Sequence, residues 1–278
     1  MPALDLLIDG VDFGEGPRWH EGRLWYSDFF QHAVYTVDAR GRREQIVEVP
    51  QQPSGLGWLP DGSLLGVSML DHQVLRYADR TLRQHADLSA IARGPCNDMT
   101  VDSRGRAYVG NFGEQLGDGP PEATLALVTP DGRAVGAIDR LQFPNGSVIT
   151  PDGRTLIIGE TAGGRYTACT IEPDGTLSGR RVWATLDGYA PDGCTLDAEG
   201  AIWFADARGQ RVVRVREGGE ITHTIDVPAN TYACTLGGED GRTLFILTAL
   251  SFDAATTAGR GAGQILTTRV DVPHAGLP

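Results

Sequence analysis

The stretch FPNGSVITPDGRTL, residues 143–156, contains two glycine turn signals close together. The second, Pro151-Asp152-Gly153, lies between two apolar runs. It predicts a tight hairpin turn, because glycine adopts the positive φ that such turns require. The first, Asn145-Gly146, lies where a strand begins rather than where two strands join. It therefore needs an explanation other than a hairpin turn.

The hairpin signal recurs along the chain at steps of 40, 43, 48, 47 and 41 residues. Its glycine falls at Gly22, Gly62, Gly105, Gly153, Gly200 and Gly241. Each turn is preceded by a short half-polar segment and followed by an apolar one, such as RLWYSD (23–28) or TLIIGE (155–160). An alternating third segment follows, and most units add a fourth. Four short strands repeated at this period are typical of a β-propeller.

The sixth unit ends after its third strand. The N-terminal segment ALDLLID, residues 3–9, precedes the first complete unit and supplies the missing strand. Strand-length segments separated by Gly and Pro leave no room for a long helix. The sequence therefore predicts an all-β, six-bladed β-propeller with four-stranded blades. Residues 1–278 form a single domain, and the N-terminal strand closes the ring by joining the last blade.

Charge and composition narrow the functional classes. The 278 residues carry a net charge of −12, which argues against nucleic acid and anionic membranes as partners. All 24 basic residues are arginine, so mechanisms that need a lysine Schiff base or a P-loop lysine are excluded.

The four cysteines show no metal-site spacing, and we expect free thiols. No apolar run approaches the roughly 20 residues of a membrane span, and the N-terminus lacks the pattern of a signal peptide. We expect a cytoplasmic protein; its oligomeric state stays open.

Polar residues recur at the start of the first strand of each unit. This strand lines the channel of a propeller, so equivalent positions of the six units face one axis. Aligned on their turns, the units place there Glu15, Ser54, Asn97, Asn145, Asp192 and Tyr232. In four of the six a glycine follows, which lets the backbone crowd the axis. Asn145 is therefore predicted to be one member of a ring of side chains.

Three members of this ring carry the oxygen ligands of a metal site. Glu15, Asn145 and Asp192 together bring a charge of −2, which suits a hard divalent cation completed by water and Asn97. No histidine belongs to the ring, which argues against structural zinc. An isolated Asn-Gly is more often a turn, and Glu15 alone could be a surface acid. The hairpin turns are, however, already assigned elsewhere in each unit. Strand alternation points Cys96 and Cys194 away from the channel.

Four motifs resemble the senescence marker protein/gluconolactonase family, also called the regucalcin family. They are EGPRW at Glu15, CNDM at Asn97, FPNG with TPDGRTL at Asn145, and APDGCTLDAEGAIW at Asp192, within residues 13–250. The resemblance implies a six-bladed propeller that hydrolyses lactones with one catalytic divalent metal at the channel mouth. It also implies that Glu15, Asn145 and Asp192 bind the metal and that Asn97 contacts substrate.

The chain departs from the family pattern at three positions. Pro95 lies two residues before Asn97, where sugar-lactonase relatives carry a substrate-contacting arginine. Ser147 follows the PNG motif in place of a bulky aliphatic residue, and Arg18 replaces an apolar one. These changes leave the metal ligands intact and leave the identity of the lactone open.

Lactone hydrolysis needs a polarised carbonyl, an activated water and a stabilised oxyanion. A divalent ion (calcium, zinc, manganese, magnesium or iron(II)) supplies the first and third. Asp192 is the predicted general base, and activation of the water by the metal is the alternative. Predicted substrate contacts are Asn97, Arg18, Phe29, Asn111 and Tyr232, with further mouth-loop candidates Phe30, Met69, Phe112, Glu160, Asp206 and Arg208. The Gly/Pro-rich insertion 114–123 is either a lid or a surface loop.

Two other functions stay open beside a metal-dependent lactonase acting on a small molecule. The same metal site could hydrolyse phosphotriesters, which a panel of lactones and organophosphates would distinguish. The propeller could also be a non-catalytic calcium-binding scaffold, in which the metal stabilises the fold without hydrolysis.

Overall fold

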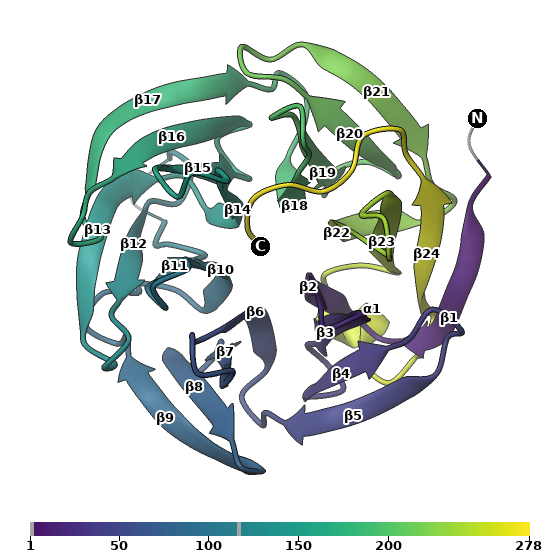
Figure 1. The fold of residues 1–278 in the computed structure, drawn as a ribbon, viewed down its shortest axis with the longest axis horizontal. Helices are drawn as coiled ribbons and strands as arrows, with labels where there is room; N and C mark the ends of the chain where they lie inside the picture. Colours follow the sequence, from purple (N-terminus) through teal and green to yellow (C-terminus); the bar gives the residue numbers. More distant parts are fainter. Residues whose placement is uncertain (1–2, 116–117) are drawn as a thin grey trace.

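The computed structural model describes residues 3–115 and 118–278, which form six four-stranded antiparallel sheets around a central axis (Figure 1). The predicted six-bladed β-propeller is confirmed. From the channel outward, the first two blades are β2 Gly14–His20, β3 Arg23–Asp28, β4 Ala33–Val37, β5 Arg43–Glu48, and β6 Pro53–Trp58, β7 Leu64–Ser68, β8 Gln73–Ala78, β9 Thr81–Asp87. The next two are β10 Cys96–Val101, β11 Ala107–Asn111, β12 Ala123–Val128, β13 Ala134–Leu141, and β14 Pro144–Ile149, β15 Thr155–Glu160, β16 Arg165–Ile171, β17 Leu177–Thr185.

The last two blades show how the ring closes. The fifth blade contains β18 Pro191–Leu196, β19 Ile202–Asp206, β20 Arg211–Val215 and β21 Ile221–Asp226. The sixth contains β22 Asn230–Gly237, β23 Thr243–Ala249, β24 Gly263–Arg269 and, outermost, β1 Asp5–Val11. β1 runs antiparallel to β24, with Asp5 opposite Thr267. The N-terminal strand therefore closes the ring, as the sequence predicts.

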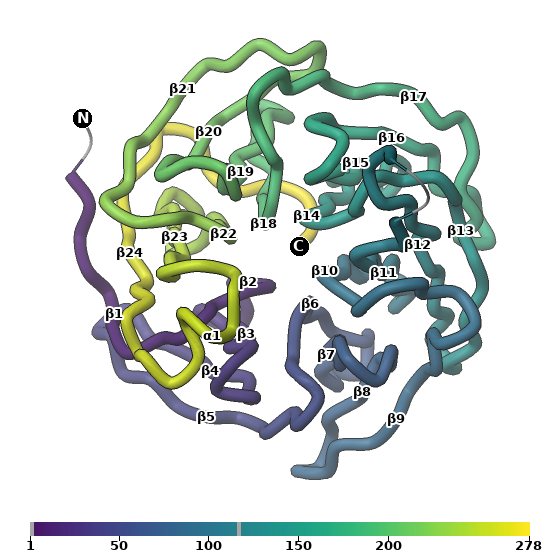
Figure 2. Tube along the Cα trace, turned by 180° about the vertical axis from the view of Figure 1, so that it is seen from behind, coloured from purple at the N-terminus to yellow at the C-terminus, as the bar shows by residue number. Residues whose placement is uncertain are grey.

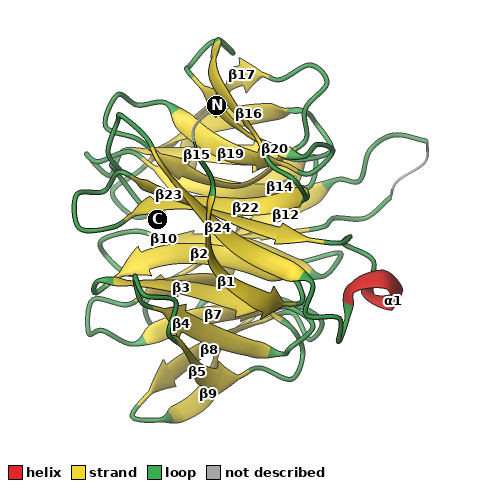
Figure 3. Ribbon diagram, turned by 90° about the vertical axis from the view of Figure 1, so that its right-hand side faces the viewer, coloured by secondary structure: helices red, strands yellow, loops and turns green. Residues whose placement is uncertain are grey.

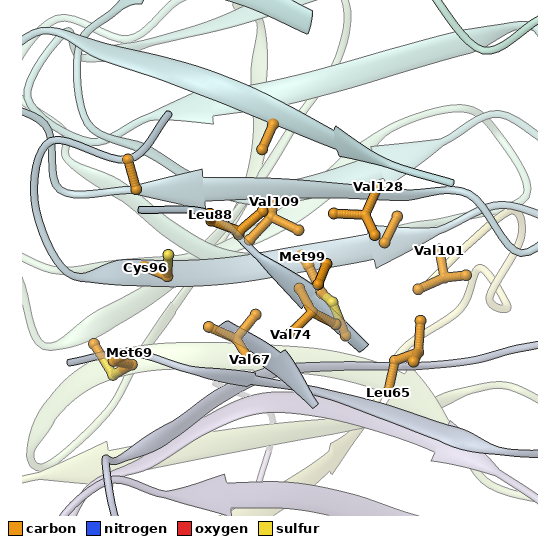
Figure 4. Close-up of a cluster of buried hydrophobic side chains, with 14 of the residues drawn as sticks. Leu65, Val67, Met69, Val74, Leu88, Cys96, Met99, Val101, Val109 and Val128 are labelled. Atoms are coloured by element: carbon orange, nitrogen blue, oxygen red, sulfur yellow. The ribbon is translucent and has the colours of Figure 1, made fainter. Parts of the chain in front are cut away.

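The repeated turns and apolar strands explain why the chain folds this way. All six predicted hairpin glycines adopt positive φ, between 69° at Gly153 and 85° at Gly62. The apolar strands pack between neighbouring blades. Figure 4 shows one such layer, where Val67 and Val74 of the second blade lie close to Met99 of the third. Burying an aliphatic side chain of this size contributes about 1.5–3 kcal/mol, so each blade is stabilised chiefly by its neighbours.

One short helix is the only helix formed by the described residues. This helix, α1 Ala254–Thr257, lies in the loop between β23 and β24 and is capped by Asp253, whose side chain accepts from the Thr256 N–H. Figure 3 shows it projecting from one face of the ring, and Figure 2 views the ring from that face. None of the helical segments in the described part of the chain has the length and apolar character needed to cross a bilayer.

The C-terminal segment crosses the opposite face of the ring and reaches its centre (Figure 1). Leu277 exchanges two backbone hydrogen bonds with Ile149, the last residue of β14, over 2.7 and 3.0 Å. Ala275 donates to the carbonyl of Leu196, the last residue of β18. Because inner strands end on this side, the segment covers the end of the channel that lies away from the predicted ring.

Candidate active site at the channel mouth

Each inner strand contains one extra residue at the ring position. In β2, Glu15 lies opposite Ser27 and Arg18 lies opposite Trp25, so three steps on the inner strand match two on its partner. The same irregularity occurs in the other five inner strands, between Pro53 and Leu56, Cys96 and Met99, Pro144 and Ser147, Pro191 and Cys194, and Thr231 and Ala233. Such β-bulges redirect side chains and are frequent at functional sites. Five of the six ring residues fall inside these intervals and Glu15 begins its own, so Asn145-Gly146 is explained as part of a bulge.

The glycines beside the ring residues permit neighbouring inner strands to touch. A Cβ atom on Gly146 would lie 2.4 Å from the carbonyl oxygen of Asp192, and one on Gly55 would lie 2.2 Å from the amide nitrogen of Met99. No larger residue fits without a shift of the backbone. The predicted crowding of the axis is therefore confirmed, and it holds the ring residues of adjacent blades in fixed relation.

The structure buries the three predicted metal ligands together. Glu15, Asn145 and Asp192 are 4%, 5% and 6% exposed. Burial raises the pKa of Glu15 well above its ordinary value, and the carboxylates of Asp192 and Asp98 raise it further. Burial likewise raises the pKa of Asp192, with Asp98 adding to the effect and the Asn145 side chain opposing it. Arg18 opposes the shift of Glu15 without outweighing it, and a cation bound between the two buried carboxylates would stabilise both.

Two of these side chains also leave buried oxygens without partners. Oδ1 of Asn145 and Oδ1 of Asp192 are buried and accept no hydrogen bond from the protein. The Asn145 nitrogen donates to Oγ1 of Thr161 over 3.1 Å, so its oxygen is the free atom. Nearby, Nδ2 of Asn97 is buried and also lacks a partner. Carboxylate and amide oxygens without other partners fit a hard divalent cation.

The ligand set contains two carboxylates and one amide. Within residues 3–115 and 118–278, no group of three His, Cys, Asp or Glu side chains could hold a metal ion. A site of Glu15, Asn145 and Asp192 differs from such clusters because its third oxygen comes from asparagine. This composition favours calcium or another oxygen-preferring ion over a thiolate or imidazole site.

Arg18, predicted as a substrate contact on a mouth loop, lies elsewhere. It belongs to β2 and is 3% exposed. Its Nη2 lies 2.7 Å from Oδ1 of Asp98 and 2.6 Å from the Met99 carbonyl oxygen. Its Nε donates to the Leu56 carbonyl, and its Nη1 donates to the Pro17 carbonyl. The guanidinium is thus bonded inside the channel, between three inner strands, rather than presented to a ligand at the mouth.

Asn111 and two other mouth candidates are bonded within their own blades. The Asn111 nitrogen donates to the Thr124 carbonyl over 2.8 Å, and its oxygen accepts from the Gly113 N–H over 3.0 Å. Glu160 accepts from Arg165 and from the N–H of Gln142. Asp206 accepts likewise from Arg211 and from the N–H of Ala190. Each of the three ends the second strand of its blade and fixes a loop there, whereas Arg208 is exposed.

Phe29 and Tyr232 meet through a third aromatic side chain. Phe13, which precedes β2, stacks on Phe29 with 5.0 Å between ring centroids and lies 4.6 Å from the Tyr232 ring. Phe30 contacts the same ring at 5.8 Å. Met69 and Phe112 pack in the same cluster. The mouth therefore has an aromatic wall, and it includes Phe13, which is not predicted from the sequence.

The insertion 114–123 joins β11 to β12 on the face that carries the ring. Its base is a pair of backbone hydrogen bonds between Glu114 and Glu122, of 2.9 and 3.0 Å. Residues 116 and 117 of the predicted lid lie outside the described residues. The two alternatives for this insertion, a lid over the mouth or a surface loop, both remain predictions.

The four cysteines are free and buried, as predicted. Burial raises the pKa of Cys96, and that of Cys194, to about 12 in each case. Cys96 packs in the apolar cluster between the second and third blades. Cys96 and Cys194, the two cysteines next to ring residues, therefore do not supply thiolate ligands to the proposed metal site.

Comparisons with known proteins agree with the motifs. A model of the SMP-30/gluconolactonase/LRE-like region matches residues 13–250. Pentonolactonase XacC of Haloferax volcanii is 29% identical over 294 residues, which cover 100% of this chain and 97% of that protein. A 6-deoxy-6-sulfogluconolactonase of Pseudomonas putida is 25% identical over 281 residues, covering 95% and 94%.

The fold is also that of solved relatives. A crystal structure described as a calcium-binding protein, regucalcin, from Agrobacterium tumefaciens superimposes with a TM-score of 0.83 at 24% identity, covering 100% of this chain and 97% of that one. The family model spans most of the chain, and the motifs that carry it coincide with the bulged inner strands. The chain therefore belongs to the SMP-30/gluconolactonase/LRE-like family.

Proposed function

We propose that the protein is a divalent-metal-dependent lactonase whose metal is held by Glu15, Asn145 and Asp192. One observation carries the proposal: two buried oxygens, on Asn145 and Asp192, have no partner beside a third buried acid at the mouth of a closed channel. The names of the relatives, a pentonolactonase and a sulfogluconolactonase, support cyclic esters as the substrate class.

When bound, the metal would polarise the ester carbonyl and stabilise negative charge on its oxygen. Asp192 is the proposed general base. It takes a proton from water as the water oxygen bonds to the carbonyl carbon, and it returns that proton to the ring oxygen as the C–O bond of the lactone breaks. The product is the open hydroxy acid, with no net change at Asp192.

Asn97 is the proposed substrate contact. Its Nδ2 group is buried and unpartnered, while its Oδ1 faces Oγ of Ser54 at 3.5 Å. An amide nitrogen held in this way can donate to a substrate oxygen and would gain a hydrogen bond when the substrate binds. The aromatic wall of Phe13, Phe29 and Tyr232 would contact the less polar side of the lactone ring.

The proposal is tested by proton release from a panel of sugar lactones and simple γ- and δ-lactones. Metal-stripped protein is assayed before and after restoration with each divalent ion, beside Asp192→Asn and the control Asp197→Asn. Asp197 is also a buried acid of the fifth blade, but it follows the last residue of β18 and is paired with Arg214 of the third strand, β20. We expect activity that needs the ion, is lost in Asp192→Asn and persists in the control. Absence of hydrolysis with every lactone and ion would contradict the proposal, and hydrolysis of organophosphates alone would replace it.

A further inference from the structure

A third buried carboxylate lies close to the two proposed acidic ligands. Asp98 is 3% exposed and follows Asn97 in the bulge of β10. Gly55 is packed between this carboxylate and the strand of Glu15: a Cβ on Gly55 would lie 2.8 Å from Oδ1 of Asp98, and one on Gly16 would lie 3.1 Å from the Gly55 Cα. Taken alone, the three acids would give the channel mouth a charge of −3, which is larger in magnitude than the charge of a divalent cation.

Arg18 is the cation that faces Asp98. The two side chains form an ion pair of 2.7 Å, with each 3% exposed. Oδ1 of Asp98 also accepts the N–H of Met99 over 2.9 Å. The guanidinium is held by carbonyls of β6 and β10 as well, so it is fixed in position. Arg18 therefore places a positive charge beside Asp98 inside the channel.

We propose that Arg18 neutralises Asp98 and thereby sets the charge of the metal site at −2, which matches a divalent cation. This inference rests on the proposed function, because it assumes a metal held by Glu15, Asn145 and Asp192. An ion pair acts on a nearby cation only as a dipole, whereas an unpaired charge acts in full at low dielectric. Asp98 is assigned the ion pair with Arg18 and no bond to the metal, and its Oδ1 accepts from both Arg18 and Met99.

The test is a set of calorimetric titrations of metal-stripped protein with Ca²⁺ and with Tb³⁺. Four proteins are compared: the parent, Asp98→Asn, the double variant Arg18→Met/Asp98→Asn, and Asp197→Asn as the control. The control removes one carboxylate from a buried ion pair of 2.6 Å with Arg214, remote from the mouth. It changes the net charge of the protein as Asp98→Asn does.

We expect Asp98→Asn to weaken Ca²⁺ binding about tenfold or more, because the charge of Arg18 is then uncompensated. Tb³⁺ binding should weaken further, in proportion to its larger charge. In the double variant both affinities should return to the parent values, although one more side chain has been removed. The control should leave both affinities unchanged.

Different failures have different meanings. If the parent binds neither ion, the proposed metal site is wrong. If the parent binds Ca²⁺ and the double variant stays as weak as Asp98→Asn, Asp98 itself contributes to binding and the role assigned to Arg18 is overturned. Circular dichroism checks folding of each variant. Should Asp98→Asn not fold, the double variant alone decides, because loss of affinity there contradicts a neutral pair.

Discussion

The side-chain nitrogen of Asn145 donates a hydrogen bond of 3.1 Å to Oγ1 of Thr161. The Thr161 hydroxyl donates its only hydrogen to the Pro191 carbonyl, 2.7 Å away and adjacent to Asp192 in sequence. It can therefore only accept from Asn145, which fixes the amide so that its oxygen is the free atom. Thr161 thus links the orientation of one proposed ligand to the strand that carries another.

Replacement of Thr161 by valine should free the Asn145 amide to rotate. We expect Ca²⁺ affinity to fall about 10- to 100-fold, as is typical when a partner that orients a ligand is lost. Thr161→Ser keeps the hydroxyl and should bind like the parent. Calorimetric titration of both variants checks this, and equal affinities for the two would show that the hydrogen bond does not orient the ligand.

Metal removal should destabilise the fold. A divalent ion would relieve the repulsion between the buried carboxylates of Glu15 and Asp192, and an ion present at 100 times its Kd adds about 2.7 kcal/mol of stability. For a chain of this size, that corresponds to a rise in Tm of roughly 5–10 °C. Thermal unfolding with Ca²⁺ or with a chelator measures the shift. Asp192→Asn should show little or none, and an equal shift in that variant would place the stabilising ion elsewhere.

Glu160 should make stability depend on pH. Burial alone would raise the pKa of Glu160, but hydrogen bonds from Arg165, Thr167 and the Gln142 N–H together lower it. A lowered pKa contributes stability above the unfolded value of about 4.3, and that contribution is lost as pH falls through the folded value. Glu160→Gln should therefore cost about 1–3 kcal/mol at pH 7 and progressively less below pH 4.3. Urea unfolding of parent and variant across this range tests it; a cost independent of pH would contradict the ionic origin.

Gly146→Ala should disrupt the site through the backbone. The new Cβ would lie 2.4 Å from the Asp192 carbonyl oxygen, so β14 and β18 must separate. We expect a loss of about 1–3 kcal/mol or more and the loss of lactone hydrolysis. Gly119→Ala is the control, because a Cβ there meets nothing within 4 Å. Urea midpoints and proton-release assays of both variants decide, and an active Gly146→Ala would show that the ring tolerates displacement.

The sequence reveals those parts of the molecule that repeat. Every blade reuses one hairpin glycine, so the period exposes all six blades and the strand that closes the ring. The positions of Glu15, Asn145 and Asp192 follow from the same alignment, since each lies at the bulge of an inner strand. A repeat of this kind averages over six copies, which removes the ambiguity of any single short strand.

Features that occur once were not predictable in this way. The pair of Arg18 and Asp98 joins residues of different blades, and no local pattern signals that contact. Asn111 carries an amide that could contact a substrate, but both ends of that amide are hydrogen-bonded to the backbone of its own blade. The C-terminal segment that contains Leu277 has no period and no turn signal, so its path across the propeller follows only from the assembled strands.

Closure of the ring by β1 and β24 has a consequence for biosynthesis. Because β1 precedes β24 in the chain, it is synthesised earlier and stays without its partner strand until β24 has been made. A blade that folds before the ring closes carries only its own residue of the proposed site. Glu15 and Asp192, which belong to different blades, are held toward one another only when the ring is complete. Ion binding at the mouth would therefore report the last step of folding, and a chain arrested before β24 would have most of its blades without a working site.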